Sequence, residues 1–233
     1  MRQKLFSENE IVEIYNKHVK KDLSYYNKCN ERYSKLSVED KNKFFNIDFP
    51  RVSSLFDFQD WIKKYNLTHV DSLLSTYRKD YELDYINCNH ITYCEYDNGK
   101  NDLHTLNLEK TDYDMIIFNQ TLEHLYNPFV CMENLYNHLR VGGYLYTTVP
   151  TINIPHMVPF HFWGITPIGL CMLCKSVGFD ILECGFWGNY KYINYIFSQG
   201  KWPNNSEVFE SNMEIKSTDL CQVQTWVLVQ KIS

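Results

Sequence analysis

Three histidines, His124, His156 and His161, are the candidates for proton transfer, because imidazole is the side chain that titrates nearest to neutral pH. His156 and His161 lie in a proline-rich loop, and His124 follows Glu123 after an apolar run. His161, in a His-Phe-Trp run, could instead pack and fix a turn, and His124 could hold a loop by hydrogen bonding. We therefore expect His156 to be the freer base.

Two carboxylates, Glu95 and Asp102, could accept hydrogen bonds from hydroxyl or amino groups of a ligand. Both lie within residues 80–123, which hold ten acidic residues and two basic ones. This excess of negative charge would suit a cationic ligand. A solvated acidic face explains the same charges about as well.

The spacing of the histidines and carboxylates does not match a metal site, since HxxH and HExxH patterns are absent. We therefore expect no bound metal. Signatures of P-loop, serine-nucleophile and kinase sites are absent as well. Cys171 and Cys174 form a single CxxC without a second pair at zinc spacing, and packing within a helix is the simpler interpretation.

The composition predicts a globular protein, with 44% hydrophobic and 22% charged residues. A net charge of -5 lacks the basic footprint of a nucleic-acid-binding protein. The first residues contain no apolar signal core, so we expect a cytoplasmic protein with reduced cysteines. Residues 157–174 lack Lys, Arg, Asp and Glu, but Pro and Gly interrupt them, and we expect no membrane partner.

Short apolar runs alternate with helical patterns from residue 67 onward, which indicates a mainly parallel α/β sheet. The strands are expected at 69–75, 90–96, 114–118, 143–149, 179–184 and 225–231. The helices are expected at 54–66, 128–140 and 166–175. Residues 1–66 have helical character: Ser37 and Asp40 resemble a helix N-cap, and Pro50 is expected to end this helical region. We therefore predict that residues 1–66 form a helical extension, which could cover a domain at 67–233. The aromatic segment 185–212 is left without an element and suggests a lid or a dimer surface.

The segment from Tyr113 to Leu125, followed by Asn127-Pro128, resembles the fourth-strand region of class I S-adenosylmethionine-dependent methyltransferases. Further matching fragments follow in the same order: 139–145, 149–150, 161–170, 177–179 and 224–229. The resemblance covers roughly residues 67–231 and is closest to methyltransferases of surface-glycan and capsule gene clusters. It implies a Rossmann-like, mainly parallel seven-stranded sheet and S-adenosylmethionine as cofactor.

The resemblance also implies which residues contact the cofactor. Glu95 would accept the two ribose hydroxyls, Asp102 would accept the adenine amino group, and Leu103 would flank the adenine ring. The full set implied for cofactor binding is Ser75, Thr76, Tyr77, Glu95, Tyr96, Asp102, Leu103, His104, Asn119, Gln120 and Thr121.

The turn after the first strand departs from the family pattern. Class I enzymes carry a GxGxG-like run there, because the backbone must approach the cofactor closely. In this chain the run is Ser75-Thr76-Tyr77-Arg78-Lys79, and no glycine lies between Val52 and Gly99. Either this turn still presents backbone N–H groups to the ligand, or cofactor binding is weakened or lost.

The expected function is therefore methyl transfer to oxygen of a small polar acceptor, a sugar, nucleotide-linked sugar or capsule precursor, including one with a phosphoramidate or phosphate group. His156, His161 and His124 are the catalytic candidates, and Tyr126 and Trp163 could form walls of the acceptor pocket. The alternative is a degenerate methyltransferase fold that serves as a partner or scaffold subunit. A nicotinamide-dependent oxidoreductase is disfavoured, since it needs the same glycines. A homodimer is compatible with the sequence.

Overall fold

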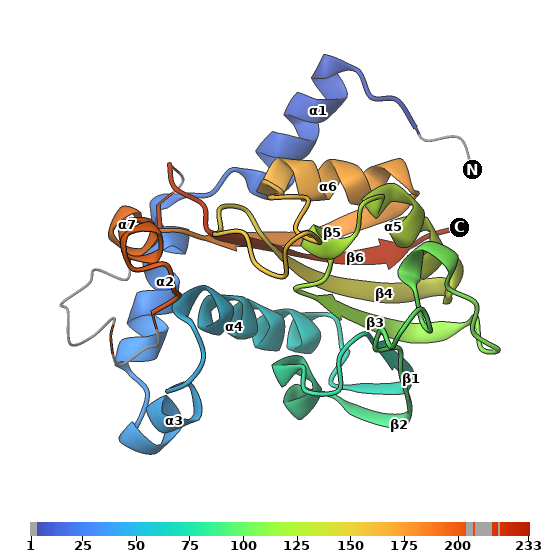
Figure 1. Cartoon of the computed structure of the whole chain (residues 1–233), viewed down its shortest axis with the longest axis horizontal. Coiled ribbons are helices and arrows are strands. Elements are labelled where there is room, and N and C mark those ends of the chain that lie inside the picture. Colours follow the sequence, from blue (N-terminus) through green and yellow to red (C-terminus); the bar gives the residue numbers. More distant parts are fainter. Residues whose placement is uncertain (1–3, 204–206, 208–215, 219) are drawn as a thin grey trace.

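The computed structural model describes residues 4–203, 207, 216–218 and 220–233. In this part of the chain six strands form one sheet, in the order β2-β1-β3-β4-β6-β5 (Figure 1). The strands β2, β1, β3 and β4 run parallel, whereas β6 is antiparallel to both β4 and β5. Their bounds are β1 His69–Ser75, β2 Asn87–Tyr93, β3 Tyr113–Asn119, β4 Leu139–Pro150, β5 Phe179–Trp187 and β6 Gln224–Lys231.

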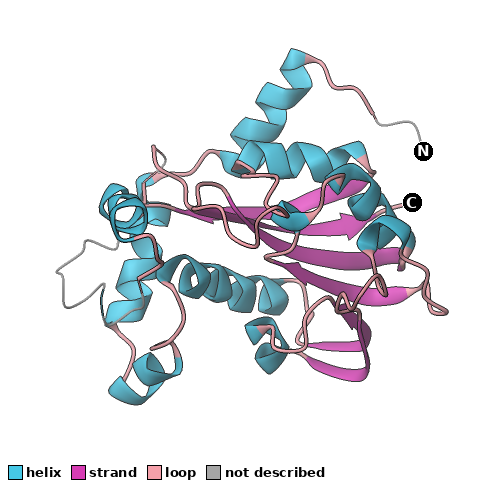
Figure 2. Cartoon of the chain, viewed as in Figure 1, coloured by secondary structure: helices cyan, strands magenta, loops and turns pink. Residues whose placement is uncertain are grey.

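Helices cover both faces of the sheet, so the fold has three layers (Figures 1 and 2). Helix α4 (Phe49–Lys64) packs on β5 and β6 from one side, and α6 (Pro167–Ser176) packs on the same strands from the other. Alternate residues of β3 join the two apolar clusters: Ile116 lies in one, and Ile117 in the other. Burial on both faces is the reason that this strand reads as a continuous apolar run.

Short polar residues followed by proline fix the starts of the helices on the sheet. The Asn127 side chain accepts a hydrogen bond from Val130 N–H at the start of α5 (Pro128–Asn137), and Thr166 caps α6 in the same way. Helix α7 (Tyr190–Gln199) begins at a similar Asn189 cap. Such caps satisfy N–H groups that the helix leaves unpaired. The remaining helical elements are α1 Glu8–Ile14, a π-helical turn Tyr15–Val19, α2 Leu23–Ser34, α3 Val38–Lys43 and short 3-10 turns at Tyr81–Tyr85, Leu103–Thr105 and Leu122–His124.

All six strand segments expected from the sequence are present: the first has the predicted bounds 69–75, and the bounds of the other five are shifted. The second strand ends at Tyr93 and not at residue 96. The fourth strand begins at Leu139, because Leu139 pairs with Tyr113 of β3 and is therefore not part of the helix predicted at 128–140. Pro50 lies in the first turn of α4 and does not end a helical region, because a residue in the first turn of a helix needs no backbone N–H. The Ser37–Asp40 cap is confirmed at the start of α3.

The expected seven-stranded sheet is wrong: the sheet has six strands. The physical reason lies between β2 and β3. A further parallel strand there would need a crossover on each side, and a crossover takes about a dozen residues or more. Residues 94–112 instead form a bridge between Asp97 and Lys100 and the 3-10 turn at Leu103–Thr105, and are too few for both crossovers.

Helix α2 of the N-terminal region is hydrogen-bonded to the sheet. The Tyr25 hydroxyl in α2 lies 2.7 Å from Phe186 N and 3.0 Å from Phe186 O in β5. The division of the chain at residue 66 stays a prediction. Part of the segment left unassigned at 185–212 is β5 and α7, and 204–206 and 208–212 lie outside the described residues. No helix in the described stretches combines the length and the apolar character needed to cross a bilayer.

Candidate functional site

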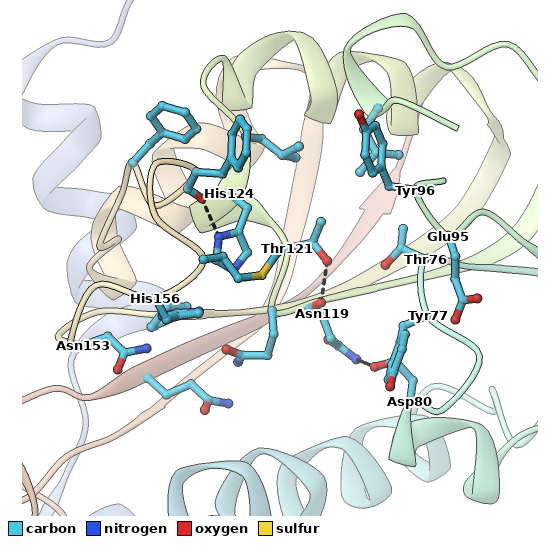
Figure 3. A pocket seen from close by; sticks show the side chains of 18 of the residues that line it. Thr76, Tyr77, Asp80, Glu95, Tyr96, Asn119, Thr121, His124, Asn153 and His156 are labelled. Carbon is cyan, nitrogen blue, oxygen red and sulfur yellow. Dashed lines mark hydrogen bonds between the residues drawn. The ribbon is translucent and has the colours of Figure 1, made fainter. Parts of the chain in front are cut away.

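A cavity of about 1250 Å³ opens at the carboxyl ends of the parallel strands (Figure 3). Thr76 follows β1, Glu95 follows β2, Asn119 ends β3, and Pro150 ends β4, and all four line the cavity. Strand β1 pairs with β2 on one side and with β3 on the other, so the strand order reverses here. Ligands of open α/β sheets bind at such a reversal.

The glycine-free turn after β1 is held by the side chain of Ser75. Its hydroxyl lies 2.7 Å from the carbonyl oxygen of Tyr77 and 3.1 Å from Asp80 Oδ2, and it accepts the Tyr77 N–H at 3.3 Å. None of residues 75–80 has a positive φ. The backbone therefore adopts this turn without the conformations that favour glycine.

The turn leaves the cavity open. The side chains of Tyr77 and Tyr81 line it and keep 49% and 41% of their surface exposed, so neither ring is buried in the crevice. Thr76 is buried at its edge, and its hydroxyl has no hydrogen-bond partner among the described residues. Gln120, in the loop after β3, has a left-handed backbone with φ of 46°. Its side-chain amide donates to Thr148 Oγ1 at 3.0 Å.

A buried ionic network lies beneath the cavity. The guanidinium of Arg51, from α4, donates to Glu82 Oε2 at 2.7 Å, to Thr148 Oγ1 at 3.0 Å and to Asp80 Oδ1 at 3.3 Å. The Asn119 amide donates to the same Asp80 oxygen at 3.3 Å. This network ties α4 to the turn after β1 and to the ends of β3 and β4.

One guanidinium faces two carboxyl groups in this network. Burial raises the pKa of Glu82 to about 7 and raises the pKa of Asp80, and Arg51 opposes both shifts. Arg51 thus favours the ionised form of both carboxyl groups, against the effect of burial. Sequence analysis did not single out Arg51, Asp80 or Glu82, because a helical pattern does not show which polar position faces the end of a sheet.

Glu95 is positioned by the turn after β1. Its Oε1 accepts the backbone N–H of Arg78 at 2.7 Å, and its Oε2 lies 3.4 Å from Arg78 Nε. A carboxylate oxygen can accept more than one hydrogen bond, so both oxygens keep capacity for a ligand. Glu95 comes two residues after β2 ends, and not at the end of that strand as expected.

Asp102, His104 and Tyr126 form a connected group on the same side of the cavity. Asp102 Oδ1 accepts the backbone N–H of His104 at 2.9 Å and faces its Nδ1 at 2.7 Å. His104 Nε2 accepts the N–H of Asn127, so Nδ1 carries the ring proton. The backbone N–H and then the ring of His104 hold the pKa of Asp102 below its usual value. The ring of His104 stacks on Tyr126 with centroids 4.0 Å apart, which orients Tyr126 at the cavity.

The loop that carries His156 and His161 is held at both ends. Ile165 N–H donates to the carbonyl of Pro150 at 3.0 Å, and Thr151 Oγ1 donates to the carbonyl of Ile165 at 2.9 Å. A Cβ on Gly164 would clash with the Thr151 carbonyl, so only glycine fits this close approach. The loop also contacts the turn that carries His124: Phe162 N–H donates to the carbonyl of Glu123 at 2.8 Å.

These contacts bring His124, His156 and His161 together. Their ring centroids lie 4.6–5.8 Å apart. His124 Nδ1 lies 2.6 Å from the carbonyl oxygen of Phe160 and so donates to it (Figure 3). Burial lowers the pKa of His124 and of His161, and the neighbouring imidazoles add to both shifts. Glu123 lies under the cluster, and burial raises its pKa to about 7.

The structure gathers most of the predicted site residues at one cavity. Three lie outside its lining: Ser75, His161 and Trp163. Ser75 holds the turn, His161 lies behind His156, and the indole of Trp163 donates to the carbonyl of Leu125 at 2.8 Å. The predicted residues in the lining are Thr76, Tyr77, Glu95, Tyr96, Asp102, Leu103, His104, Asn119, Gln120, Thr121, His124, Tyr126 and His156. Lining residues that the sequence did not indicate include Asp48, Arg51, Lys79, Asp80, Asn153, Trp202 and Gln224.

Residues 74–147 match the model of a methyltransferase domain. The matched stretch runs from the last residues of β1 into β4, and it contains the turn after β1, Glu95, Asp102 and the loop after β3. The match confirms the expected enzyme class, a methyltransferase. No protein with a curated description matches the chain in sequence.

Solved structures share the fold. A Burkholderia thailandensis 1,6-didemethyltoxoflavin-N1-methyltransferase, with 1,6-didemethyltoxoflavin and S-adenosylhomocysteine bound, aligns with a TM-score of 0.51 at 10% identity and covers 100% of this chain and 94% of its own. A chain from the complex between the Haloferax volcanii Trm112 methyltransferase activator and a methyltransferase aligns with a TM-score of 0.50 at 11% identity, over 77% of this chain and 94% of its own. The Rossmann-like class I fold is thus confirmed, and the expected cofactor, S-adenosylmethionine, agrees with these comparisons.

Proposed function

We propose that this methyltransferase transfers a methyl group from S-adenosylmethionine to a hydroxyl of a small polar acceptor. The acceptor class proposed is a sugar, a nucleotide-linked sugar or a capsule precursor, including one with a phosphate or phosphoramidate group. The observation that carries the proposal is the open cavity beside a glycine-free turn in which no residue has a positive φ. This cavity is large enough for a donor and an acceptor, since single-ligand pockets usually measure about 300–1,000 Å³.

The donor is proposed to lie on the side of Thr76 and Glu95 (Figure 3), where it would also contact Asp102 of the cavity lining. Glu95 would accept the ribose hydroxyls and Asp102 the adenine amino group, as charge-assisted hydrogen bonds. Four carboxylates and two cationic side chains line the cavity: Asp48, Asp80, Glu95, Asp102, Arg51 and Lys79. This excess of negative charge favours a cationic sulfonium over a neutral ligand.

The acceptor is proposed to lie at the opposite side, near His124, Asn153 and His156 (Figure 3). Amide side chains and aromatic rings line this side, and amides offer both donors and acceptors to hydroxyl groups. The indole of Trp202 donates to Asn153 Oδ1 at 2.7 Å, which leaves the NH₂ group of Asn153 to donate to the acceptor. A hydroxyl-rich acceptor such as a sugar fits these groups better than a flat apolar one.

In the proposed reaction the acceptor oxygen forms a bond to the methyl carbon as the bond from that carbon to sulfur breaks. The hydroxyl proton passes to an unprotonated imidazole of the cluster, and S-adenosylhomocysteine leaves as a neutral thioether. His156 lines the cavity, and its Nδ1 lies 3.2 Å from the carbonyl of Ile154, so Nε2 is the nitrogen with a free lone pair. His156 is thus the base candidate, and His124 and His161 position it.

The second candidate function is a methyltransferase-fold subunit that binds no cofactor and acts as a partner or scaffold, and the missing glycines motivate it. The proposed enzyme is cytoplasmic and has no membrane partner. The net charge of -5 supports the absence of a nucleic-acid partner as well. Exposed aromatics of α7, Tyr190 and Phe197, offer a surface for a homodimer.

Calorimetric titration with S-adenosylhomocysteine separates the two functions. We expect saturable binding at one site and a rise in melting temperature, because a ligand that binds only the folded state stabilises it. Absence of both effects at millimolar ligand would support the scaffold. Adenosine serves as the control ligand, since it lacks the amino-acid part and should bind more weakly.

His156→Ala tests the base. With a panel of nucleotide-linked sugars as acceptors, we expect release of S-adenosylhomocysteine to fall on the order of 100-fold, a typical contribution of a positioned base. Cofactor affinity should stay unchanged, because His156 lies on the acceptor side. An equal loss of turnover and of cofactor affinity would assign His156 a structural role instead.

A further inference from the structure

The three histidines come from two segments that the fold brings together. His124 lies in the 3-10 turn after β3, and His156 and His161 lie in the loop after β4. One ring nitrogen of each histidine lies within 4.8 Å of one from each of the other two. The expectation of no metal site rested on spacing along the chain, which cannot detect ligands from separate segments.

Hydrogen bonds leave ring nitrogens of this cluster available. Nδ1 of His124 and Nδ1 of His156 each face a backbone carbonyl, which can only accept, so Nε2 of both rings is unprotonated in the neutral form. His161 Nδ1 is buried and has no hydrogen-bond partner among the described residues. A carbonyl that fixes the tautomer of a histidine is the usual second contact of a metal-ligating imidazole.

A carboxyl group also lies beside the cluster. Glu123 Oε1 lies 3.7 Å from His124 Nε2, and its Oε2 is buried without a hydrogen-bond partner in the described part of the chain. A polar oxygen left unpaired in the interior is costly, and such an atom often marks an ion or water that completes the site. The cluster is open on one side, because His124 and His156 line the cavity.

We propose that His124, His156 and His161 bind a divalent transition-metal ion of the zinc type, with the fourth position open to the cavity. Three imidazoles and one open position form the ligand set of a catalytic zinc site, and imidazole also suits cobalt. Nitrogens about 2.0–2.1 Å from one tetrahedral ion lie roughly 3.4 Å apart, so the ring nitrogens, which lie within 4.8 Å of one another, must approach by up to about 1.4 Å on binding. The His156 ring already packs against both His124 and His161, with ring centroids 4.7 Å and 4.6 Å away.

The inference rests on the proposed function for its chemistry. An acceptor hydroxyl in the fourth position would have its pKa lowered by the ion, as metal-bound water does. In the loaded protein His156 is then a ligand, and the ion takes over the activation that a free imidazole would otherwise supply.

The test is titration of the metal-free, full-length protein with Co²⁺, followed by visible absorption. We expect the bands of a tetrahedral site at one equivalent, their loss on addition of Zn²⁺, and a higher melting temperature with Zn²⁺. His156→Ala and His161→Ala should each weaken Co²⁺ binding on the order of 100-fold or more, since loss of a supporting contact alone costs about 10–100-fold. His90→Ala, at an exposed histidine of β2, should leave the titration unchanged.

Circular dichroism checks that each variant is folded. Because two histidines are replaced separately, the test still works if one of the two variants does not fold. A titration without tetrahedral bands, or bands that persist in both variants, would overturn the proposal. The cobalt readout does not depend on S-adenosylmethionine. If the protein showed the cobalt bands but bound no S-adenosylhomocysteine, the proposed function would be wrong and the metal site would still be supported.

Discussion

Arg51→Leu is expected to destabilise the protein by about 3–5 kcal/mol, the cost of removing one partner from a buried ion pair. The side chain of Arg51 is 7% exposed, and Asp80 and Glu82 beside it are 4% and 0% exposed. Leucine leaves both carboxyl groups without their cation. The free energy of unfolding, from urea denaturation followed by tryptophan fluorescence, measures the loss.

The destabilisation should depend on pH in a defined direction. A carboxyl group whose pKa is raised by folding contributes stability below its unfolded pKa, and that stability is lost as the pH rises through the folded pKa. Burial already raises the pKa of Glu82 to about 7 with Arg51 present, and the substitution raises it further. Arg51→Leu should therefore cost more at pH 8 than at pH 5.5.

Two variants serve as controls for Arg51. Adding Glu82→Gln to Arg51→Leu should recover part of the stability, because one of the two buried charges is then absent. Lys43→Ala removes an exposed ion pair with Asp40 and should leave the unfolding curve unchanged. A loss below about 1 kcal/mol for Arg51→Leu would contradict the buried network as a stabilising element.

Glu95→Ala is expected to weaken S-adenosylhomocysteine binding on the order of 100-fold. Hydrogen bonds to a charged group are worth about 1.5–3 kcal/mol each, and the proposed ribose contact supplies two. Arg78 already holds the Glu95 carboxylate in place in the free protein. Cofactor binding therefore does not have to fix the position of this side chain. Calorimetry with S-adenosylhomocysteine gives the affinity of each variant.

Glu95→Gln should show an intermediate loss, since its amide keeps one acceptor oxygen without the charge. Asp97→Ala removes a carboxylate two residues further along, outside the cavity lining, and should bind as the wild type does. An affinity of Glu95→Ala within twofold of wild type would show that Glu95 does not contact the ribose.

The strands and their order along the chain could be predicted because apolar periodicity reports burial directly. The bounds could not, since they depend on pairing: Leu139 continues the apolar pattern of α5 and yet pairs with Tyr113 in the sheet. The number of strands taken from the family resemblance was wrong, because residues 94–112 are too few to add another one.

The family resemblance placed Thr76, Glu95 and Asn119 at one site, and they line one cavity because they end or follow parallel strands whose carboxyl ends meet at one edge of the sheet. The sequence did not indicate that a turn without glycine leaves the cavity beside it open. That outcome depends on Ser75, whose hydroxyl bonds Tyr77 and Asp80 and shapes the turn from a side chain.

By itself, then, the sequence determined the alternation of strands and helices, since this alternation follows from local patterns of burial and polarity, and its family resemblance indicated the carboxylates Glu95 and Asp102. Only the tertiary structure decided that Arg51 of α4 holds the carboxyl groups beneath the cavity, and that His124 lies beside His156 and His161. Contacts between residues far apart in the chain depend on how the layers pack, and the periodicity of one segment carries no information on them.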